Sequence, residues 1–112
     1  MIRRSSLPVL PAAPVDLMAV AVGDRQVILA WTEGGAGGLG FRIERAVCNS
    51  PCRAFVEIGE VGPHVAAFRD GSVIPRTTYS YRVQAWNAYG DSPFSNVVEV
   101  TPPQVGTELP DD

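Results

Sequence analysis

The chain has 112 residues, of which 46% are hydrophobic, and a formal net charge of −3 at pH 7. This length and composition indicate a single domain with one packed core and exclude a globally disordered chain. All nine basic residues are arginines that form no basic stripe, so we expect no nucleic-acid binding. No apolar run approaches the length of a membrane span, and we see no signal-peptide pattern in residues 1–13.

Three parts of the chain differ in composition. Residues 1–13 carry scattered apolar side chains between prolines, which is typical of an extended leader or linker. Residues 14–103 hold the periodic segments and form the expected domain. Residues 104–112 contain Glu108, Asp111 and Asp112 and are expected to be an acidic tail.

The first two strands are expected at residues 14–22 and 26–31. The long apolar run of the first does not settle which side chains face the core, and a bulge or a change of sheet near Ala19 would account for it. Pro14 suits an edge strand, because it cannot donate a ladder hydrogen bond. The second strand alternates cleanly, with three side chains facing inward: Val27, Leu29 and Trp31.

Three strands are expected in the middle of the chain, at residues 41–47, 55–61 and 66–70. In the first of these, Phe41 and Ile43 face inward while Arg42 and Glu44 face outward. The short strand at 66–70 is anchored by Phe68.

The two cysteines, Cys48 and Cys52, are separated by Asn-Ser-Pro. A structural zinc site needs four nitrogen or sulfur ligands, and the sequence offers no second cysteine pair and no histidine nearby, so we expect no metal site. The spacing also differs from a redox C-x-x-C motif. The simplest interpretation is a local disulfide in a hairpin loop, which favours an oxidising compartment; two free thiols in a cytosolic protein are the alternative.

The best periodic stretch runs from Thr77 to Asn87. Alternation of aromatic and β-branched residues predicts a half-buried strand, with Tyr79, Tyr81, Val83 and Ala85 on one face and Ser80, Arg82, Gln84 and Trp86 on the other. The last strand is expected at residues 95–101, with Val98 and Val100 inward, and Pro102-Pro103 ends it. Seven short strands without a helical pattern predict an all-β, seven-stranded sandwich.

The spacing of several residues resembles the fibronectin type III module over about residues 14–103. The similarity lies in Pro14 with Leu17, in Val27-x-Leu29-x-Trp31, in Phe41-x-Ile43, and above all in the alternating run from Val73 through Pro75, Tyr79 and Tyr81 to Asn87, followed by Gly90-x-Ser92 and Ser95. An antibody-type domain would need two distant cysteines instead. The sequence of the Thr77–Asn87 stretch is most similar to that of modules in bacterial extracellular enzymes and surface proteins.

The resemblance implies an immunoglobulin-like β-sandwich with two structural aromatic residues. Trp31 would lie in the second strand, and Tyr79 would form a tyrosine corner whose hydroxyl bonds to a backbone acceptor near Val73. The cysteine pair departs from the plain family pattern, and it falls in the connection after the third strand.

The outer face of the Thr77–Asn87 strand carries the candidate binding surface. Alternation places Trp86 there with Arg82 and, from a neighbouring strand, Arg42, while Tyr89 in the following loop would extend the surface. An exposed indole among arginines can stack on a sugar ring or anchor a protein. The alternative is that Trp86 packs on the arginine side chains as a cross-strand pair.

No catalytic constellation is present, since the chain has one histidine and no nucleophile beside a base. We therefore expect no enzyme activity and no cofactor. The expected function is that of an extracellular or cell-surface module that acts as a spacer or binds a protein partner or neighbouring domains. Two alternatives are a carbohydrate-binding accessory module of a secreted polysaccharide-degrading enzyme, and a self-assembling subunit whose leader or tail docks on a sheet edge.

Overall fold

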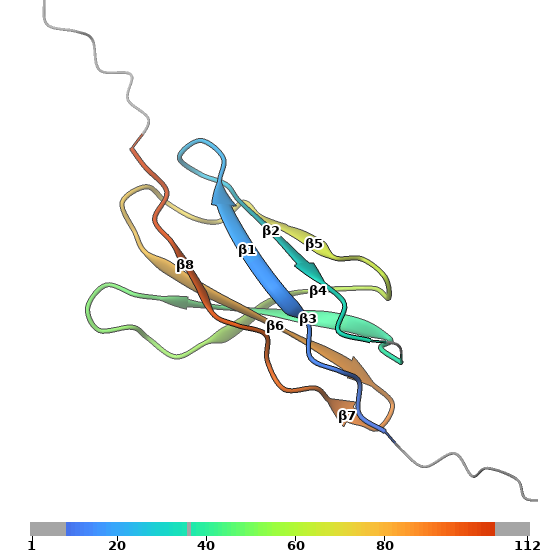
Figure 1. Cartoon of the computed structure of the whole chain (residues 1–112). Helices are drawn as coiled ribbons and strands as arrows, with labels where there is room; N and C mark the ends of the chain where they lie inside the picture. Colours follow the sequence, from blue (N-terminus) through green and yellow to red (C-terminus); the bar gives the residue numbers. More distant parts are fainter. Residues whose placement is uncertain (1–8, 36, 105–112) are drawn as a thin grey trace, which may run out of the picture.

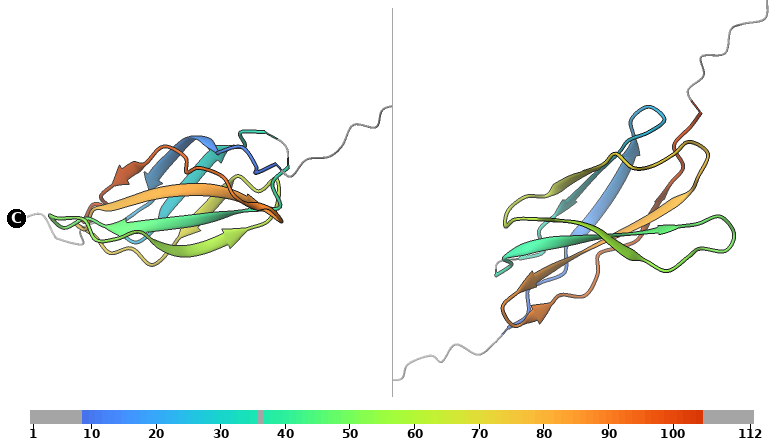
Figure 2. Two further views of the ribbon diagram at one scale, coloured as in Figure 1. Left: turned by 90° about the horizontal axis from the view of Figure 1, so that it is seen from below. Right: turned by 180° about the vertical axis from the view of Figure 1, so that it is seen from behind.

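Two antiparallel sheets packed face to face make up the computed structural model, which describes residues 9–35 and 37–104 (Figures 1 and 2). One sheet has the order β1-β2-β5, and the other has the order β4-β3-β6-β7, with β8 also pairing with β6. The strands are β1 (Val15–Ala21), β2 (Val27–Thr32), β3 (Gly40–Val47), β4 (Val56–Val61), β5 (Ala67–Asp70), β6 (Tyr79–Asn87), β7 (Gly90–Asp91) and β8 (Val98–Val100).

This architecture confirms the predicted all-β sandwich. The one additional strand is the two-residue β7, which pairs with the end of β6 at a place where the sequence indicated only a turn. No helix long and apolar enough to cross a membrane occurs in the part of the chain that the structure describes.

The core lies between the sheets and is built from alternate side chains of each strand. The largest contributions come from β2 and β6, whose inward faces are those predicted from the period of two. The rings of Trp31 and Phe41 meet edge to face, with centroids 5.5 Å apart. The buried members are Leu17, Val27, Leu29, Trp31, Phe41, Ile43, Val73, Tyr79, Tyr81, Val83 and Ala85.

Strand β6 is more deeply buried than its pattern predicted. Ser80 and Gln84, which alternation places on the outer face, are also buried. The half-buried prediction was therefore wrong for this strand, because other parts of the chain cover its outer face. Alternation identifies the two faces of a strand, but it does not report what lies over the polar one.

Strand β1 contains the bulge that its apolar run suggested, but at another position. The register with β2 shifts between Val15 and Met18, and Asp16 there has a φ of 56°. The Asn96 side chain fills the irregularity: it accepts a hydrogen bond from the Leu17 amide at 2.9 Å and donates one to the Leu17 carbonyl at 3.1 Å. This two-way contact ties β1 to the segment that leads into β8.

Beyond the bulge, the facing of β1 is settled. Leu17 is buried, whereas Met18, Val20 and Val22 point outward and are 60%, 54% and 49% exposed. β1 is an edge strand of its sheet, as Pro14 predicted.

The last strand, β8, is shorter than predicted, because residues 95–97 form no regular ladder with β6. Two serine side chains take over the pairing with β6. The hydroxyl of Ser92 accepts the Ala85 amide at 2.9 Å, and the hydroxyl of Ser95 accepts the Val83 amide at 3.0 Å. Their own amides donate to the carbonyls of the same two residues. The edge of β6 thus stays hydrogen-bonded without a regular strand.

The described chain enters and leaves at opposite ends of β6 (Figure 1). The Val9 carbonyl accepts a hydrogen bond from the Asn87 side chain at 2.8 Å, whereas the Pro102 carbonyl accepts one from the Arg76 amide at 2.8 Å. Pro11 is buried, so residues 9–13 of the expected leader lie against the module. Residues 1–8 of that leader and residues 105–112 of the expected tail lie outside the described residues.

Candidate interaction surface

The outer face of the five-stranded sheet carries the residues that sequence reasoning selected. The register of β3 with β6 places four cross-strand pairs on this face, in order along the strands: Gly40 with Trp86, Arg42 with Gln84, Glu44 with Arg82, and Ala46 with Ser80. The two strands therefore bring Arg42, Arg82 and Trp86 together, as alternation predicted.

Arg82 lies at the centre of this face between two aromatic rings. Its guanidinium carbon is 3.6 Å from the ring centroid of Phe94 and 4.1 Å from that of Phe55. It also forms an ion pair with Glu44, with an N···O distance of 2.7 Å. Phe94 lies in the irregular segment Ser92–Ser95, and Phe55 lies just before β4. A guanidinium in contact with two rings and a carboxylate is restricted in orientation, although the Arg82 side chain is still 28% exposed.

Trp86 is half-buried, as expected if it packs on the arginine side chains. The Arg42 guanidinium lies 5.2 Å from the centroid of the indole. The indole also covers Gly40, where an added Cβ would lie 2.8 Å from Nε1 of Trp86 and 2.7 Å from the Val61 carbonyl oxygen. That Nε1 is buried and has no hydrogen-bond partner among the described residues. The arrangement is the cross-strand packing that was the alternative to a sugar-binding ring.

Arg42 is held by acidic side chains on both sides. It forms a hydrogen-bonded ion pair with Asp91 of β7, and its Nε lies 3.9 Å from a Glu57 carboxylate oxygen of β4. Both partners are about half exposed, so this group contributes little to stability.

Tyr89 is the most exposed of the four candidate residues, at 62%. It lies in the turn between β6 and β7, where its amide donates to the Asn87 side-chain oxygen at 2.8 Å. Asn87 also donates to the carbonyls of Val9 and Gly37. The turn is therefore rigidly connected to two neighbouring segments and presents the phenol ring to solvent.

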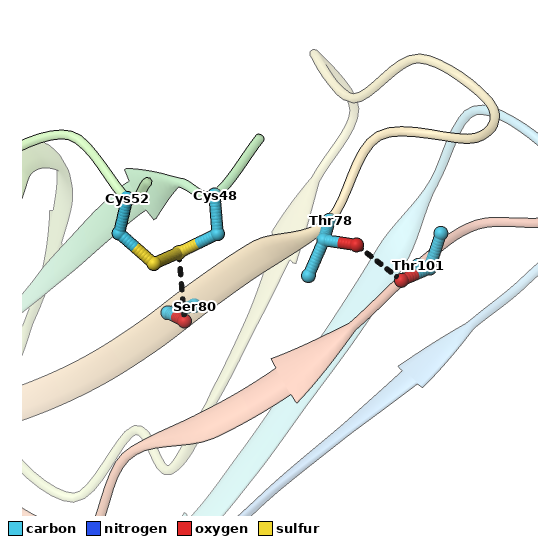
Figure 3. Close-up of a disulfide and its surroundings, with 5 residues drawn as sticks. All are labelled: Cys48, Cys52, Thr78, Ser80 and Thr101. Carbon is cyan, nitrogen blue, oxygen red and sulfur yellow. Dashed lines mark hydrogen bonds between the residues drawn. A yellow bond between two sulfur atoms is a disulfide. The ribbon is translucent and has the colours of Figure 1, made fainter. Parts of the chain in front are cut away.

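The other end of this face is covered by the cysteine loop. Cys48 and Cys52 form a disulfide, as predicted, and Cys48 continues the row of outward residues that ends in Ala46. The Ser80 hydroxyl donates to the Cys48 sulfur at 3.3 Å (Figure 3). Ala46 and Ser80 face outward but are buried, because they lie next to this loop. The same figure shows Thr78 and Thr101 hydrogen-bonded at 2.7 Å between β6 and β8.

A second polar cluster joins the two sheets at the edge of the core. The carboxylate of Asp70, only 4% exposed, accepts hydrogen bonds from Tyr81, Arg45 and Ser72. Burial by itself raises the pKa of Asp70, but the hydrogen bonds from Tyr81, Ser72 and Arg45 together outweigh burial and lower that pKa. Burial, and then the hydrogen bond to Asp70, raise the pKa of Tyr81 well above its usual value. The cluster is structural, since its donors and acceptors satisfy one another.

The two residues named as structural occupy buried positions. Trp31 lies in β2 within the core, with a buried Nε1 that has no hydrogen-bond partner among the described residues. Tyr79 begins β6, and its hydroxyl accepts a hydrogen bond from the Ile74 amide at 3.0 Å. The partner is thus next to Val73, where we expected it, but it is a backbone donor and not an acceptor.

Sequence reasoning missed several contributors to this surface. Phe55 was expected as the first residue of the strand at 55–61 but lies just before β4, and Phe94 lies beside a proline, so no alternation marked either ring as part of this surface. Asp91 of β7, which sequence reasoning did not select, pairs with Arg42 across the sheet. No cavity of a size to hold a small molecule occurs in residues 9–35 and 37–104.

No family model matches the sequence, and the comparison with curated proteins finds no match. Solved structures do match. The FN1–FN3 domains of chicken CNTN1 give a TM-score of 0.74 at 18% identity, covering 85% of this chain and 32% of that one, so this chain spans about a third of it. The FN5 domain of Drosophila Lar gives 0.69 at 21% identity, covering 85% and 99%. A structure described as that of a myokine gives 0.71 at 24% identity, covering 84% and 99%. Together with the strand order, these matches show that the chain has the fibronectin type III fold.

Proposed function

We propose that this chain is a non-catalytic, extracellular or cell-surface module that acts as a spacer between neighbouring domains and as a unit that contacts proteins. The observation that carries the proposal is the position of the two ends of the described chain. The Val9 carbonyl accepts a hydrogen bond from Asn87, the last residue of β6, whereas the Pro102 carbonyl accepts one from Arg76, three residues before β6 begins. A nine-residue strand is roughly 30 Å long, so the module separates whatever precedes it from whatever follows it by about that distance.

The junctions at the two ends support the role of a spacer. Pro11, Pro14 and Pro102 are buried, and proline restricts the backbone where the chain enters and leaves. A module whose ends are anchored in this way transmits its orientation to its neighbours better than one joined by flexible glycine-rich segments.

The extracellular assignment rests on the disulfide. Disulfides form and persist in oxidising compartments and are rare in reducing ones. Alkylation of the protein in its source cells, without added reductant, is expected to leave both cysteines unlabelled. Rapid double labelling would contradict the assignment.

For protein contact, Tyr89 is the candidate whose side chain remains open to a partner. The side chains of Arg42, Arg82 and Trp86 already contact other residues of the same sheet. Carbohydrate binding through Trp86 is not favoured, because Arg42 lies over the indole and the indole N–H is buried. Self-assembly through residues 9–13 is not favoured either, because these residues already lie against their own module.

The spacer role is tested by placing the full chain between a donor and an acceptor fluorescent protein. We expect a narrow distribution of transfer efficiency. Inserting a second copy should move this distribution to a lower efficiency. A Gly-Ser linker of equal length is the control, and it should give a broad distribution. If the chain and the Gly-Ser linker give the same distribution, the spacer role is wrong.

A further inference from the structure

We propose that reduction of the Cys48–Cys52 disulfide creates a binding site for a thiophilic divalent cation such as Zn²⁺, with the two thiolates and the Glu99 carboxylate as ligands. Sequence reasoning excluded a zinc site because it found no further ligand near the two cysteines. The fold supplies one from a strand almost fifty residues away.

The register of three strands explains why Glu99 is there. In the β3–β6 ladder Ala46 is opposite Ser80, and in the β6–β8 ladder Ser80 is opposite Glu99. Cys48 lies two residues beyond Ala46 and therefore on the same face. As a result, the Cys48 sulfur, the Cys52 sulfur and a Glu99 carboxylate oxygen all lie within 4.8 Å of one another.

These separations suit a tetrahedral metal ion. With Zn–S near 2.3 Å and Zn–O near 2.1 Å, two ligand atoms on one tetrahedral zinc are about 3.5–3.8 Å apart. Once the S–S bond is broken, a small rotation of each side chain brings the three atoms to that spacing. The three intervening residues also fall within the two to four that separate paired cysteine ligands in structural zinc sites. Three protein ligands leave the fourth position to water.

Reagents can reach the site. Cys52 and Glu99 are exposed and Cys48 is half-buried. The cysteines take no part in the buried apolar cluster between the sheets, so the core does not depend on them. Two sulfur ligands favour Zn²⁺ or Cd²⁺ over Mg²⁺ and Ca²⁺, which prefer oxygen.

The chemistry balances with a dithiol as the reductant. The dithiol gives two electrons and two protons to the disulfide, which becomes two thiols, while the dithiol itself becomes a cyclic disulfide. Binding of the cation then releases the two thiol protons, because the thiolate is the ligand. The oxidised form has no thiolate, so the redox state of this one bond decides whether the cation binds.

The test measures Zn²⁺ binding by competition with a chromophoric chelator, and Cd²⁺ binding by the thiolate-to-metal band in the ultraviolet. The full chain is reduced with a dithiol, which is then removed without air. We expect one Zn²⁺ per reduced chain, no binding to the oxidised chain, and no binding to the Cys48→Ser/Cys52→Ser double variant. Glu99→Gln should bind at least tenfold more weakly, whereas Glu60→Gln, a matched change on the exposed edge strand β4, should bind like wild type.

Three outcomes would overturn the proposal. The reduced wild type could bind no more Zn²⁺ than the double serine variant. Glu99→Gln could bind as tightly as Glu60→Gln, which would remove Glu99 from the ligand set. Finally, circular dichroism could show that the chain unfolds on reduction before any metal is added, and then no register would hold Glu99 beside the thiols.

Discussion

Tyr81 of β6 donates a hydrogen bond of 2.6 Å to the carboxylate of Asp70 of β5, so the two residues connect the five-stranded sheet to the three-stranded one. Arg45 of β3 reaches the same carboxylate at 2.9 Å. Most other contacts between the sheets are apolar and have no preferred direction, apart from the hydrogen bonds of Asn96 to Leu17. The charged and directional contact at Asp70 fixes how the two sheets are placed relative to each other.

Removing the hydroxyl of Tyr81 tests that contact. We expect Tyr81→Phe to lower the free energy of unfolding by about 1.5–3 kcal/mol, because a buried carboxylate loses one of its donors. Urea denaturation followed by far-ultraviolet circular dichroism measures the change. Tyr89→Phe removes the hydroxyl of an exposed tyrosine and should leave the midpoint unchanged. Equal midpoints for the two variants would show that the contact does not stabilise the fold.

The same pair predicts a stability profile with pH. The folded state lowers the pKa of Asp70 below the ordinary aspartate value of 3.8, so the unfolded chain takes up this proton first as the pH falls. The stability from Asp70 is therefore present at neutral pH and is lost from about pH 4 downward. The folded state raises the pKa of Tyr81 above the ordinary tyrosine value of 10.0, so the stability from Tyr81 is lost as the pH rises past 10.

Denaturation midpoints measured between pH 2 and 11 check the acidic and the alkaline limb of this profile. Variants show which residue is responsible for each limb. Asp70→Asn should flatten the acidic limb, and Tyr81→Phe should flatten the alkaline limb. If the wild-type midpoint falls equally steeply in acid with and without Asp70, the acidic limb belongs to other carboxylates.

The contacts of Arg82 with Phe55 and Phe94 predict that the stability of the fold depends on the flat shape of the guanidinium group. Arg82→Lys keeps the charge near Glu44 but loses the flat group that lies against the rings, and we expect a loss of about 1 kcal/mol. A double-mutant cycle with Phe94→Leu isolates the stacking contribution. A coupling energy near zero would mean that the rings and the arginine are merely adjacent.

Gly40 allows the packing of Trp86 to be tested without changing the tryptophan. An added Cβ at Gly40 would meet the Val61 carbonyl oxygen at 2.7 Å and the indole at 2.8 Å. We expect Gly40→Ala to destabilise the fold by about 1–3 kcal/mol and to shift the tryptophan fluorescence. Gly71→Ala is the control, since an added Cβ there meets nothing within 4 Å. Unchanged stability and fluorescence in both variants would show that the indole does not need the glycine.

The sequence predicts the strands and their inward faces well, because burial in a sandwich imposes a period of two. Val27, Leu29 and Trp31 in β2, and Tyr79, Tyr81, Val83 and Ala85 in β6, lie where alternation puts them. The local disulfide is equally readable, since its two cysteines are separated by only three residues.

Contacts between distant segments could not be predicted in the same way. Phe94 reaches Arg82 from the irregular segment between β7 and β8, and Glu99 reaches the cysteines because three strands are in register. The bulge of β1 depends on Asn96, nearly eighty residues away. A pattern along one segment carries no information on the partner that covers it, and for this reason the outer face of β6 was predicted to be freer than it is.

The contact between Asn96 and Leu17 has a mechanical consequence. Strand β1 starts at the end of the sandwich where the described chain enters, and β8 finishes at the end where it leaves, so a pull on the two ends draws these neighbouring strands in opposite directions along their length. The two hydrogen bonds of the Asn96 amide to Leu17 then resist the pull side by side and have to rupture together. A single asparagine side chain thus adds two hydrogen bonds, loaded in shear, to the contacts that keep the first and last strands together under tension.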